Sequence, residues 1–232
     1  MRRNDVIALI AIVIVGGALV VLVLPLLGDR RGPTPRFVTN NTQLRGIHQS
    51  MVIYALGNKG HFPGLDSAGV LSDPTMSRRL AILLDTNAFT PDYIINPLDD
   101  HLTEAIDYGS GYVVSIYNHS FAGLDIRTSG RRRSAWSETL SRQEIVLSDR
   151  NTGPDPHANV ESVWSGSPGV WSGSIAWNDN STRYEESHIQ ATDYSGRSPY
   201  LTSAATAPSP YAFPSDNLFE AAGPHDAWMV HD

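Results

Sequence analysis

The feature that most constrains this chain is the apolar stretch from Val6 to Leu27, close to its N-terminus. It holds 22 consecutive residues without a charge or a side-chain hydrogen-bonding group, and sixteen of them are Leu, Ile or Val. A helix rises about 1.5 Å per residue, so this stretch would be about 33 Å long, close to the ~30 Å hydrocarbon thickness of a bilayer. Its composition favours insertion by several kcal/mol. The sequence therefore predicts an N-terminal transmembrane helix, with the lipid bilayer as the partner of Val6–Leu27.

Two other structures could account for an apolar stretch near an N-terminus. A cleaved signal peptide has an apolar core of about 7 to 15 residues and a small-x-small cleavage site. The run here is longer, and residues 26–31 offer no such site. A helix buried in a protein core would need protein on every side. The cationic Arg2 and Arg3 favour an N-terminus in the cytoplasm, although Arg30 and Arg31 on the other side weaken this inference.

The charge of the chain limits its partners. The whole chain carries a net charge of −7, and because residues 1–31 carry +2, the remainder carries −9. An acidic domain argues against nucleic acid as a partner, since phosphate binding requires a basic face. The chain has no cysteine, which excludes disulfides, thiolate metal sites and thiol nucleophiles. About 200 residues follow the anchor, enough for one domain with a hydrophobic core.

Two helices are predicted after the anchor. Residues 28–37 form a juxtamembrane linker whose two glycines and two prolines interrupt any helix. An amphipathic helix over residues 39–56 follows, with Thr39 or Asn40 as its N-cap. A loop over residues 57–74 precedes a second helix, from Thr75 to about Asn87. The spacing of three and four places one apolar stripe on the first helix: Leu44, Ile47, Met51, Tyr54 and Ala55.

Short strands are predicted from β-branched and aromatic runs bounded by turn residues. They are Tyr93–Ile95, Tyr112–Tyr117, Glu144–Ser148, Val170–Trp177 and Thr182–Glu186. The last two form a hairpin around the turn Asn178–Asn180, and the charges of the returning strand favour a sheet edge. Arg131–Arg133 is interpreted as a solvated loop. The predicted fold class is α+β, with the amphipathic helix packed on a small antiparallel sheet.

The chain beyond residue 186 has no clear periodicity. Five prolines and many Ser, Ala and Thr residues predict irregular structure for this Pro/Ser/Ala-rich tail. The sequence leaves open whether the tail is disordered or lies over the sheet, where Tyr200, Tyr211, Phe213, Leu218 and Phe219 could anchor it. The predicted organisation is an anchor at 1–27, a linker at 28–37, an α+β domain at 38–186 and the tail at 187–232.

Candidate catalytic and metal-binding residues were tested by their spacing. No Gly-x-Ser-x-Gly, His-Glu-x-x-His, P-loop or Gly-x-Gly-x-x-Gly motif occurs. His48 has no second ligand at i+3 or i+4, so we interpret it as a polar group at the border of its helix. Asp149, Asn151 and Asp155 could offer oxygens to calcium, but their loop lacks the EF-hand spacing and an Asx-rich turn is favoured. Glu185 and Glu186 would point to opposite faces of a strand. The sequence predicts no catalytic, cofactor-binding or metal-binding residue.

The order of these features resembles a known family. The apolar segment leads into a helix reading QLRGIHQSMVIYA at Gln43–Ala55, followed by NKGHFP at Asn58–Pro63. Near the end, WNDN at Trp177–Asn180 stands at a hairpin turn. This is similar to type IV pilin-like or pseudopilin-like proteins, the prepilin-type proteins of the type II secretion superfamily. The resemblance spans roughly residues 4 to 186 and implies an N-terminal membrane helix, an α+β domain and other pilin-like subunits as partners.

The chain departs from the family pattern at the N-terminus. Counting back from Pro25, Asn4 stands where the family has the mature Phe, Arg3 where it has the processing Gly, and Ala8 where it has Glu. In the family this Gly permits cleavage by the prepilin peptidase, and this Glu assists docking in a filament. Processing and filament assembly therefore stay open for this chain.

The resemblance predicts a non-enzymatic, single-pass membrane protein with a structural or assembly role at the cell envelope. Its place would be a bacterial cytoplasmic membrane, with the C-terminal domain outside. The alternative is a membrane-anchored extracytoplasmic enzyme or ligand-binding domain whose site has no recognisable motif.

Overall fold

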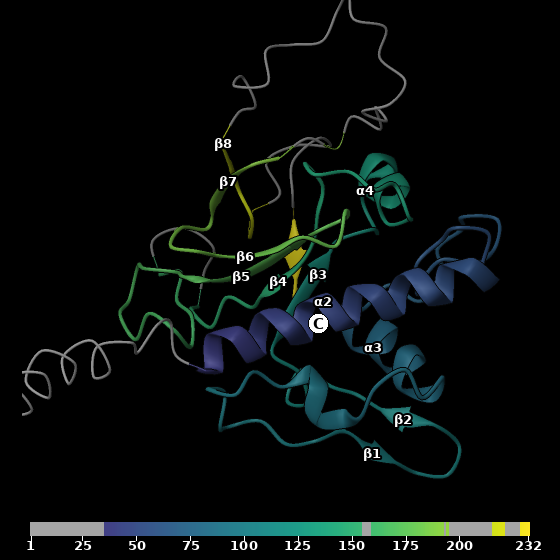
Figure 1. Ribbon diagram of the computed structural model, residues 1–232, viewed down its shortest axis with the longest axis horizontal. Coiled ribbons are helices and arrows are strands. Elements are labelled where there is room, and N and C mark those ends of the chain that lie inside the picture. The colour runs from purple at the N-terminus through teal and green to yellow at the C-terminus, as the bar shows by residue number, and fades with distance from the viewer. Residues whose placement is uncertain (1–34, 155–158, 193, 195–214, 221–227) are drawn as a thin grey trace, which may run out of the picture. The chain divides into compact units, whose positions relative to one another are not determined.

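A computed structural model describes residues 35–154, 159–192, 194, 215–220 and 228–232 (Figure 1). These residues belong to one compact unit that begins at Arg36, apart from Pro35 itself. Within them, no helix combines the length and apolarity needed to cross a membrane. The predicted anchor Val6–Leu27 lies outside the described residues.

A five-stranded antiparallel sheet forms the centre of the unit, with the strand order β6-β5-β4-β3-β9. Its strands are β3 (Phe121–Leu124), β4 (Ile145–Asp149), β5 (Gly173–Trp177), β6 (Thr182–Glu185) and β9 (Met229–Val230). Phe121 pairs with Asp149 and Ser148 with Ile175, so the two central registers are fixed by buried residues. The prediction of an α+β fold with a small antiparallel sheet is confirmed, as are the β5–β6 hairpin and the edge position of β6.

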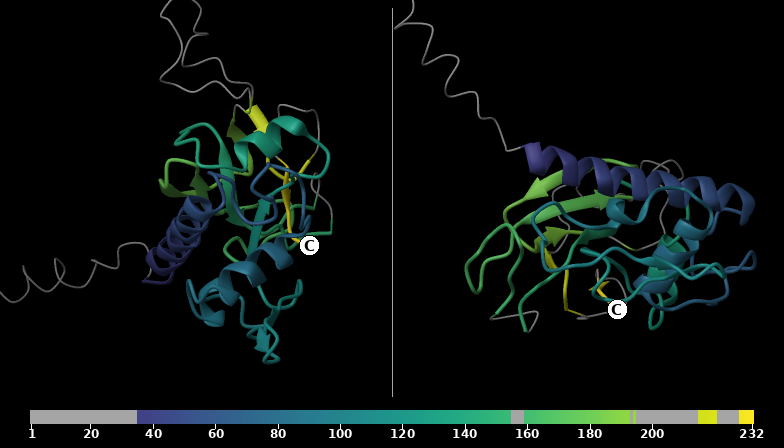
Figure 2. Two further views of the ribbon diagram at one scale, coloured as in Figure 1. Left: turned by 90° about the vertical axis from the view of Figure 1, so that its right-hand side faces the viewer. Right: turned by 90° about the horizontal axis from the view of Figure 1, so that it is seen from below.

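Helix α2 (Pro35–Gly57) crosses one face of this sheet (Figures 1 and 2). The predicted stripe is buried at Leu44, Ile47, Met51 and Ala55, each at most 1% exposed. The helix begins at Pro35, because the fixed φ of proline suits the first turn of a helix. The predicted N-cap at Thr39 or Asn40 is therefore wrong, and residues 35–37 of the predicted linker are helical.

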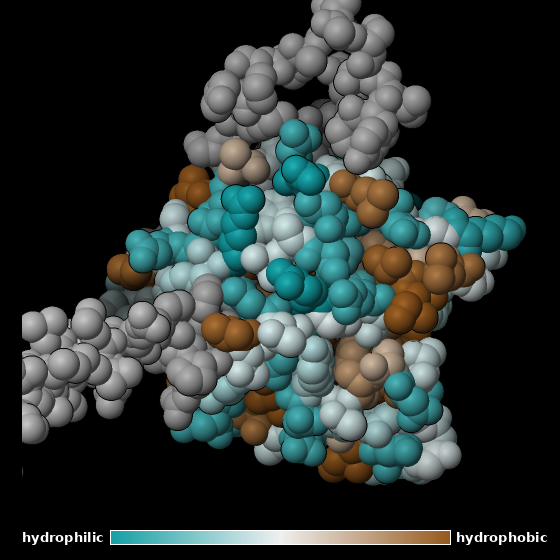
Figure 3. Space-filling view, in the orientation of Figure 1, coloured by the Kyte–Doolittle hydropathy of each residue, from teal (hydrophilic) through white to brown (hydrophobic). Residues whose placement is uncertain are grey.

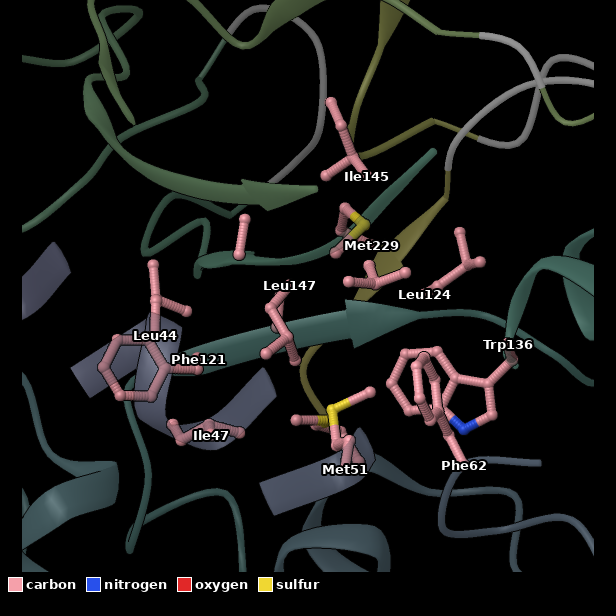
Figure 4. Close-up of a cluster of buried hydrophobic side chains, with 14 of the residues drawn as sticks. Leu44, Ile47, Met51, Phe62, Phe121, Leu124, Trp136, Ile145, Leu147 and Met229 are labelled. Atoms are coloured by element: carbon pink, nitrogen blue, oxygen red, sulfur yellow. The ribbon is translucent and has the colours of Figure 1, made fainter. Parts of the chain in front are cut away.

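The core covers both faces of the sheet. Every residue of β3, β4 and β5 is buried, and successive strand residues point to opposite faces, so both faces are covered by protein. Figure 4 shows the side next to α2, where Met51 lies beside Leu147 and Phe62 beside Trp136. The rings of Phe62 and Trp136 meet edge to face at 5.7 Å. The chain beyond residue 186 contributes Tyr194, Leu218 and Phe219 to the core.

Two further helices flank the sheet. Helix α3 (Met76–Asp85) is capped by Thr75, whose hydroxyl accepts a hydrogen bond from the backbone N–H of Arg78. Helix α4 (Gly130–Ala135) replaces the solvated loop that was predicted for Arg131–Arg133. That prediction is wrong because Arg132, only 3% exposed, donates to the backbone oxygen of Asp125 and to the hydroxyl of Thr128. The guanidinium of Arg132 thus supplies hydrogen-bond donors to oxygen atoms of the loop that precedes α4.

Two predicted strands are also corrected. Tyr93–Ile95 is not a strand, because Pro91 begins a short 3-10 helix, η1 (Pro91–Ile94). Of Tyr112–Tyr117 only β2 (Tyr112–Val113) is a strand, and it pairs with β1 (Ile106–Asp107) in a separate two-stranded sheet. The Asn118 side chain accepts hydrogen bonds from the N–H and the hydroxyl of Ser115, which turns the chain away from extended structure.

The described part of the C-terminal tail lies on the domain. Strands β7 (Ile189–Ala191) and β8 (Ser215–Asn217) form a second two-stranded sheet, and β9 completes the central sheet beside β3. The predicted boundary at residue 187 does not separate these strands from the compact unit. The other predicted anchors of the tail, Tyr200, Tyr211 and Phe213, lie outside the described residues.

Candidate functional site

A groove between α2 and the β5–β6 turn is the strongest candidate for a functional surface. It has a volume of about 330 Å³, and we call it the α2–turn groove. Its walls come from α2, from the chain just after α4 and from the hairpin turn. The lining residues are His48, Gln49, Val52, Ile53, Glu138, Leu140, Asn178, Asp179 and Asn180.

The turn that forms one wall is held rigidly. Asn178 is fully buried, and its Nδ2 donates to the backbone oxygens of Ala135 and Ser137 at 2.8 and 2.9 Å. Asn180 has a φ of 65°, a left-handed conformation that asparagine tolerates better than most residues. Asp179 pairs with Arg142 at 3.2 Å. The predicted turn at Asn178–Asn180 is confirmed, and its side chains fix the groove.

His48 connects the helix to this turn. It is 1% exposed, and its Nδ1 lies 3.2 Å from Oδ1 of Asn180. Burial lowers the pKa of His48 below its usual 6.5, and the hydrogen bond to Asn180 opposes this shift. A neutral ring with hydrogen on Nδ1 donates to Asn180, which leaves Nε2 as a buried acceptor without a partner among the described residues. The interpretation of His48 as a border residue of the helix is thereby refined: it is a buried link to the hairpin.

The groove is bordered by exposed apolar side chains. Ile53 is 69% exposed and Leu56, one turn further along α2, is 76% exposed. Leu140 is 54% exposed and has a φ of 56°, which is rare for leucine and costs free energy. Figure 3 shows hydrophobic surface over the C-terminal half of α2. Packing within this chain does not explain why Leu140 adopts a strained backbone conformation and yet leaves its side chain in solvent.

The candidate calcium loop is not arranged for a cation. The carboxylate of Asp149 is buried in β4, and its partners are all donors: Nδ2 of Asn40 and Asn96, Nε1 of Trp164 and the N–H of Ser174. Burial raises the pKa of Asp149 to about 6, against the effect of these hydrogen bonds. Oδ1 of Asn151 accepts from the N–H of Gly153 and of Glu161, which is the favoured Asx turn. Asp155 lies outside the described residues.

Three side chains far apart in the sequence form a cluster that spacing could not reveal. Oγ of Ser77 lies 3.0 Å from Nε2 of His119, and Nδ1 of His119 donates to the backbone oxygen of Phe121 at 2.9 Å. The ring of His231 packs on His119 at 4.3 Å. Burial lowers the pKa of His119 well below 6.5. Ser77 and His119 are 7% and 0% exposed, so this pair lies inside the domain.

Among residues 35–232 as far as the structure describes them, no three His, Cys, Asp or Glu side chains are grouped so as to hold a metal ion. No family model matches the chain, and neither the curated proteins nor the solved structures contain a detectable relative of it.

Proposed function

We propose that this chain is a non-enzymatic, single-pass membrane protein of pilin-like type, which binds another envelope subunit through the α2–turn groove. The sequence supports the anchor through the 22 apolar residues of Val6–Leu27. The α+β arrangement, with a helix that buries the stripe Leu44, Ile47, Met51 and Ala55 beside an antiparallel sheet, is compatible with the pilin-like resemblance.

The observation that carries the binding role is the exposed apolar border of the groove. Ile53 and Leu140 line the hollow and are each more than half exposed, and Leu56, one turn after Ile53 on α2, is 76% exposed. Single exposed apolar residues are ordinary, whereas a group beside a groove is typical of a protein interface. A partner with an apolar side chain could cover this border.

Membrane fractionation with N-terminal sequencing tests the anchor. A carbonate-resistant membrane form that starts at Met1 supports a permanent anchor, and one that starts at Asn4 supports processing of the pilin type. A soluble form that starts near Gly28 would contradict the anchor.

Site-specific photocrosslinking in intact membranes tests the groove. A photoreactive residue at position 53 is expected to capture a membrane protein, identified by mass spectrometry, whose N-terminal segment is also apolar and pilin-like. Val38 is the matched control, because it lies on the same helix, is 56% exposed and does not line the groove. Equal capture from positions 38 and 53, or capture of a soluble protein, would argue against the proposal.

A membrane-anchored hydrolase is the second candidate, and the Ser77–His119 pair favours it. A serine hydroxyl within hydrogen-bond reach of a neutral histidine is the geometry of an activated nucleophile. Labelling of the full chain by a fluorophosphonate probe, abolished by Ser77→Ala, would support a hydrolase. An unlabelled chain would leave this pair with a structural role, joining α3 to the segment just before β3.

A further inference from the structure

A second surface lies on the part of the domain that carries η1, β1 and β2, below α2 in Figure 1. We call residues 85–118 the acidic lobe. These residues include six Asp or Glu and no Lys or Arg. The negative charge of the chain is therefore concentrated in one region, where it favours cationic partners.

The same lobe exposes a group of large apolar side chains. Ile106, Tyr108 and Val113 of the β1–β2 hairpin are 58%, 66% and 58% exposed, and Tyr117 is 69% exposed. Both residues of β1 and one of β2 are exposed, so the hairpin lies on the surface of the domain. An apolar group of this kind, next to polar and charged side chains, is typical of a binding surface.

A hollow of about 450 Å³ is lined by α2 and by the part of the lobe that precedes the hairpin in the sequence. Its lining includes the exposed carboxylates of Asp92, Asp100 and Glu104, and Glu104 stands two residues before β1. Gln43, 7% exposed, also lines the hollow, and its Oε1 is buried without a hydrogen-bond partner among the described residues. The fourth carboxylate, Asp99, is already held by Arg150 at 3.0 Å.

This arrangement fits an extended cationic partner better than a metal ion. The carboxylates of the hollow do not form a group that could hold a metal, as judged over the described residues. A Lys or Arg side chain can instead enter the hollow, where the carboxylates and Oε1 of Gln43 are acceptors, while Nε2 of Gln43 already donates to the backbone oxygen of Ile95. The lobe is also rigid at its base, because Nδ2 of Asn118 donates to the backbone oxygen of Thr103 and the Asp85 carboxylate accepts the N–H of Tyr112.

We propose that the acidic lobe docks a cationic segment of another protein, with a Lys or Arg in the hollow and apolar side chains on the β1–β2 hairpin. The inference does not depend on the membrane anchor or on the α2–turn groove. The partner is specified by its chemistry: alternating basic and aliphatic side chains in an extended segment.

Fluorescence anisotropy of the full chain in neutral detergent tests the proposal. The probe is a labelled strand-length peptide of alternating lysine and valine. The triple variant Asp92→Asn, Asp100→Asn, Glu104→Gln is expected to weaken its binding about tenfold. The hairpin variant Tyr108→Ser, Val113→Ser is expected to weaken binding by a similar factor, and a lysine–serine peptide should bind the original chain about tenfold more weakly.

The matched control changes the same net charge outside the lobe and outside the α2–turn groove, through Glu161→Gln, Glu185→Gln and Glu186→Gln. It should alter binding by less than about twofold, because exposed charges far from the site are screened. An equal loss in this control, or equal binding of the lysine–serine peptide, would overturn the proposal. Circular dichroism of each variant separates lost binding from lost folding.

Two experiments without peptide test whether the lobe instead binds a second copy of the chain or the lipid bilayer. Analytical ultracentrifugation of the original chain could show a dimer that is lost in the hairpin variant. That result would assign the lobe to a second copy of the chain and overturn the proposal. The chain has no cysteine, so Tyr108→Cys allows a polarity-sensitive dye to be attached at one position. If the emission of this dye is shifted to the blue in lipid nanodiscs without peptide, the hairpin contacts lipid. That result would also overturn the proposal.

Discussion

Nδ2 of Asn40 donates to both carboxylate oxygens of Asp149, at 3.1 and 2.8 Å, and thereby joins α2 to β4 across 109 positions of sequence. The same Nδ2 also donates to Oγ of Ser174 on β5 at 2.8 Å. Because Asn96 and Trp164 also donate to Asp149, one buried carboxylate organises a helix, two strands and two loops. Each of these donors would lose its acceptor if the carboxylate were removed.

Asp149→Leu is therefore expected to destabilise the domain by about 3–5 kcal/mol, since it leaves several buried donors unsatisfied. Asp149→Asn keeps one oxygen in place and should cost roughly half as much. Chemical denaturation of the two variants measures the difference. Equal costs would show that the hydrogen bonds to this carboxylate contribute little.

Asp149 also predicts a pH dependence. Its pKa is raised from 3.8 to about 6, so the folded chain binds this proton more tightly than the unfolded chain does. The contribution of Asp149 to stability is then greatest below pH 3.8 and falls by about 3 kcal/mol as pH rises to about 6. The stability difference between the original chain and Asp149→Asn should follow this slope, because other titrating groups cancel. A flat difference over that range would contradict the prediction.

For His48 we expect the contribution to stability to depend on pH with the opposite sign. Its pKa is lowered by burial, so the unfolded chain binds the proton more readily below the usual pKa of 6.5. The stabilising contribution of neutral His48 is complete above pH 6.5 and is lost as pH falls. His48→Gln should therefore be less stable than the original chain at pH 8, with the difference narrowing in acid. A difference that widens in acid would show that the charged ring is the stabilised form.

Gly46 gives room to Tyr93. A Cβ at Gly46 would lie 2.3 Å from Oη of Tyr93, which donates to the backbone oxygen of Thr42. Gly46→Ala is expected to destabilise the domain by about 1 kcal/mol, although alanine favours a helix. Gly57, the last residue of the same helix, has no atom near its Cβ position, so Gly57→Ala should be neutral or stabilise by up to about 1 kcal/mol. Thermal unfolding of both variants checks the sign.

Asp232 caps helix α3. Its Oδ1 accepts from the N–H of Met76 at 2.8 Å and its Oδ2 pairs with Arg127 at 2.7 Å. Asp232→Ala is expected to cost about 1–2 kcal/mol through the lost cap and ion pair. Asp73→Ala removes only the ion pair with Arg78, whose side chain is 56% exposed, and should cost less than about 0.5 kcal/mol. Urea denaturation that ranks the two variants in the reverse order would contradict this assignment.

The hairpin and the buried stripe of α2 could be predicted because their signals are local. Alternation from Trp171 to Trp177 and a turn rich in asparagine and aspartate specify β5 and β6 without further information. The stripe from Leu44 to Ala55 likewise requires only the helical period.

Other elements depend on partners that the local sequence does not contain. Strand β3 is short and includes Gly123, so it gives almost no strand signal, and β9 has only two residues. Arg132 is buried because its guanidinium donates to the backbone oxygen of Asp125 and to the hydroxyl of Thr128. The charge of three consecutive arginines predicts exposure and gives no sign of these partners. His119 and His231 meet only after the sheet has formed, so no spacing rule could pair them.

The position of β9 has a consequence for how the chain is made. Strand β3 lies between β4 and β9, and Gly123 pairs with Val230, more than a hundred positions downstream. While a ribosome is still adding the residues between them, Leu124 has no neighbour on that side and α3 lacks the cap from Asp232. The nascent domain must therefore remain incomplete until residues 229–232 emerge, and a chaperone that shields β3 would act during that interval.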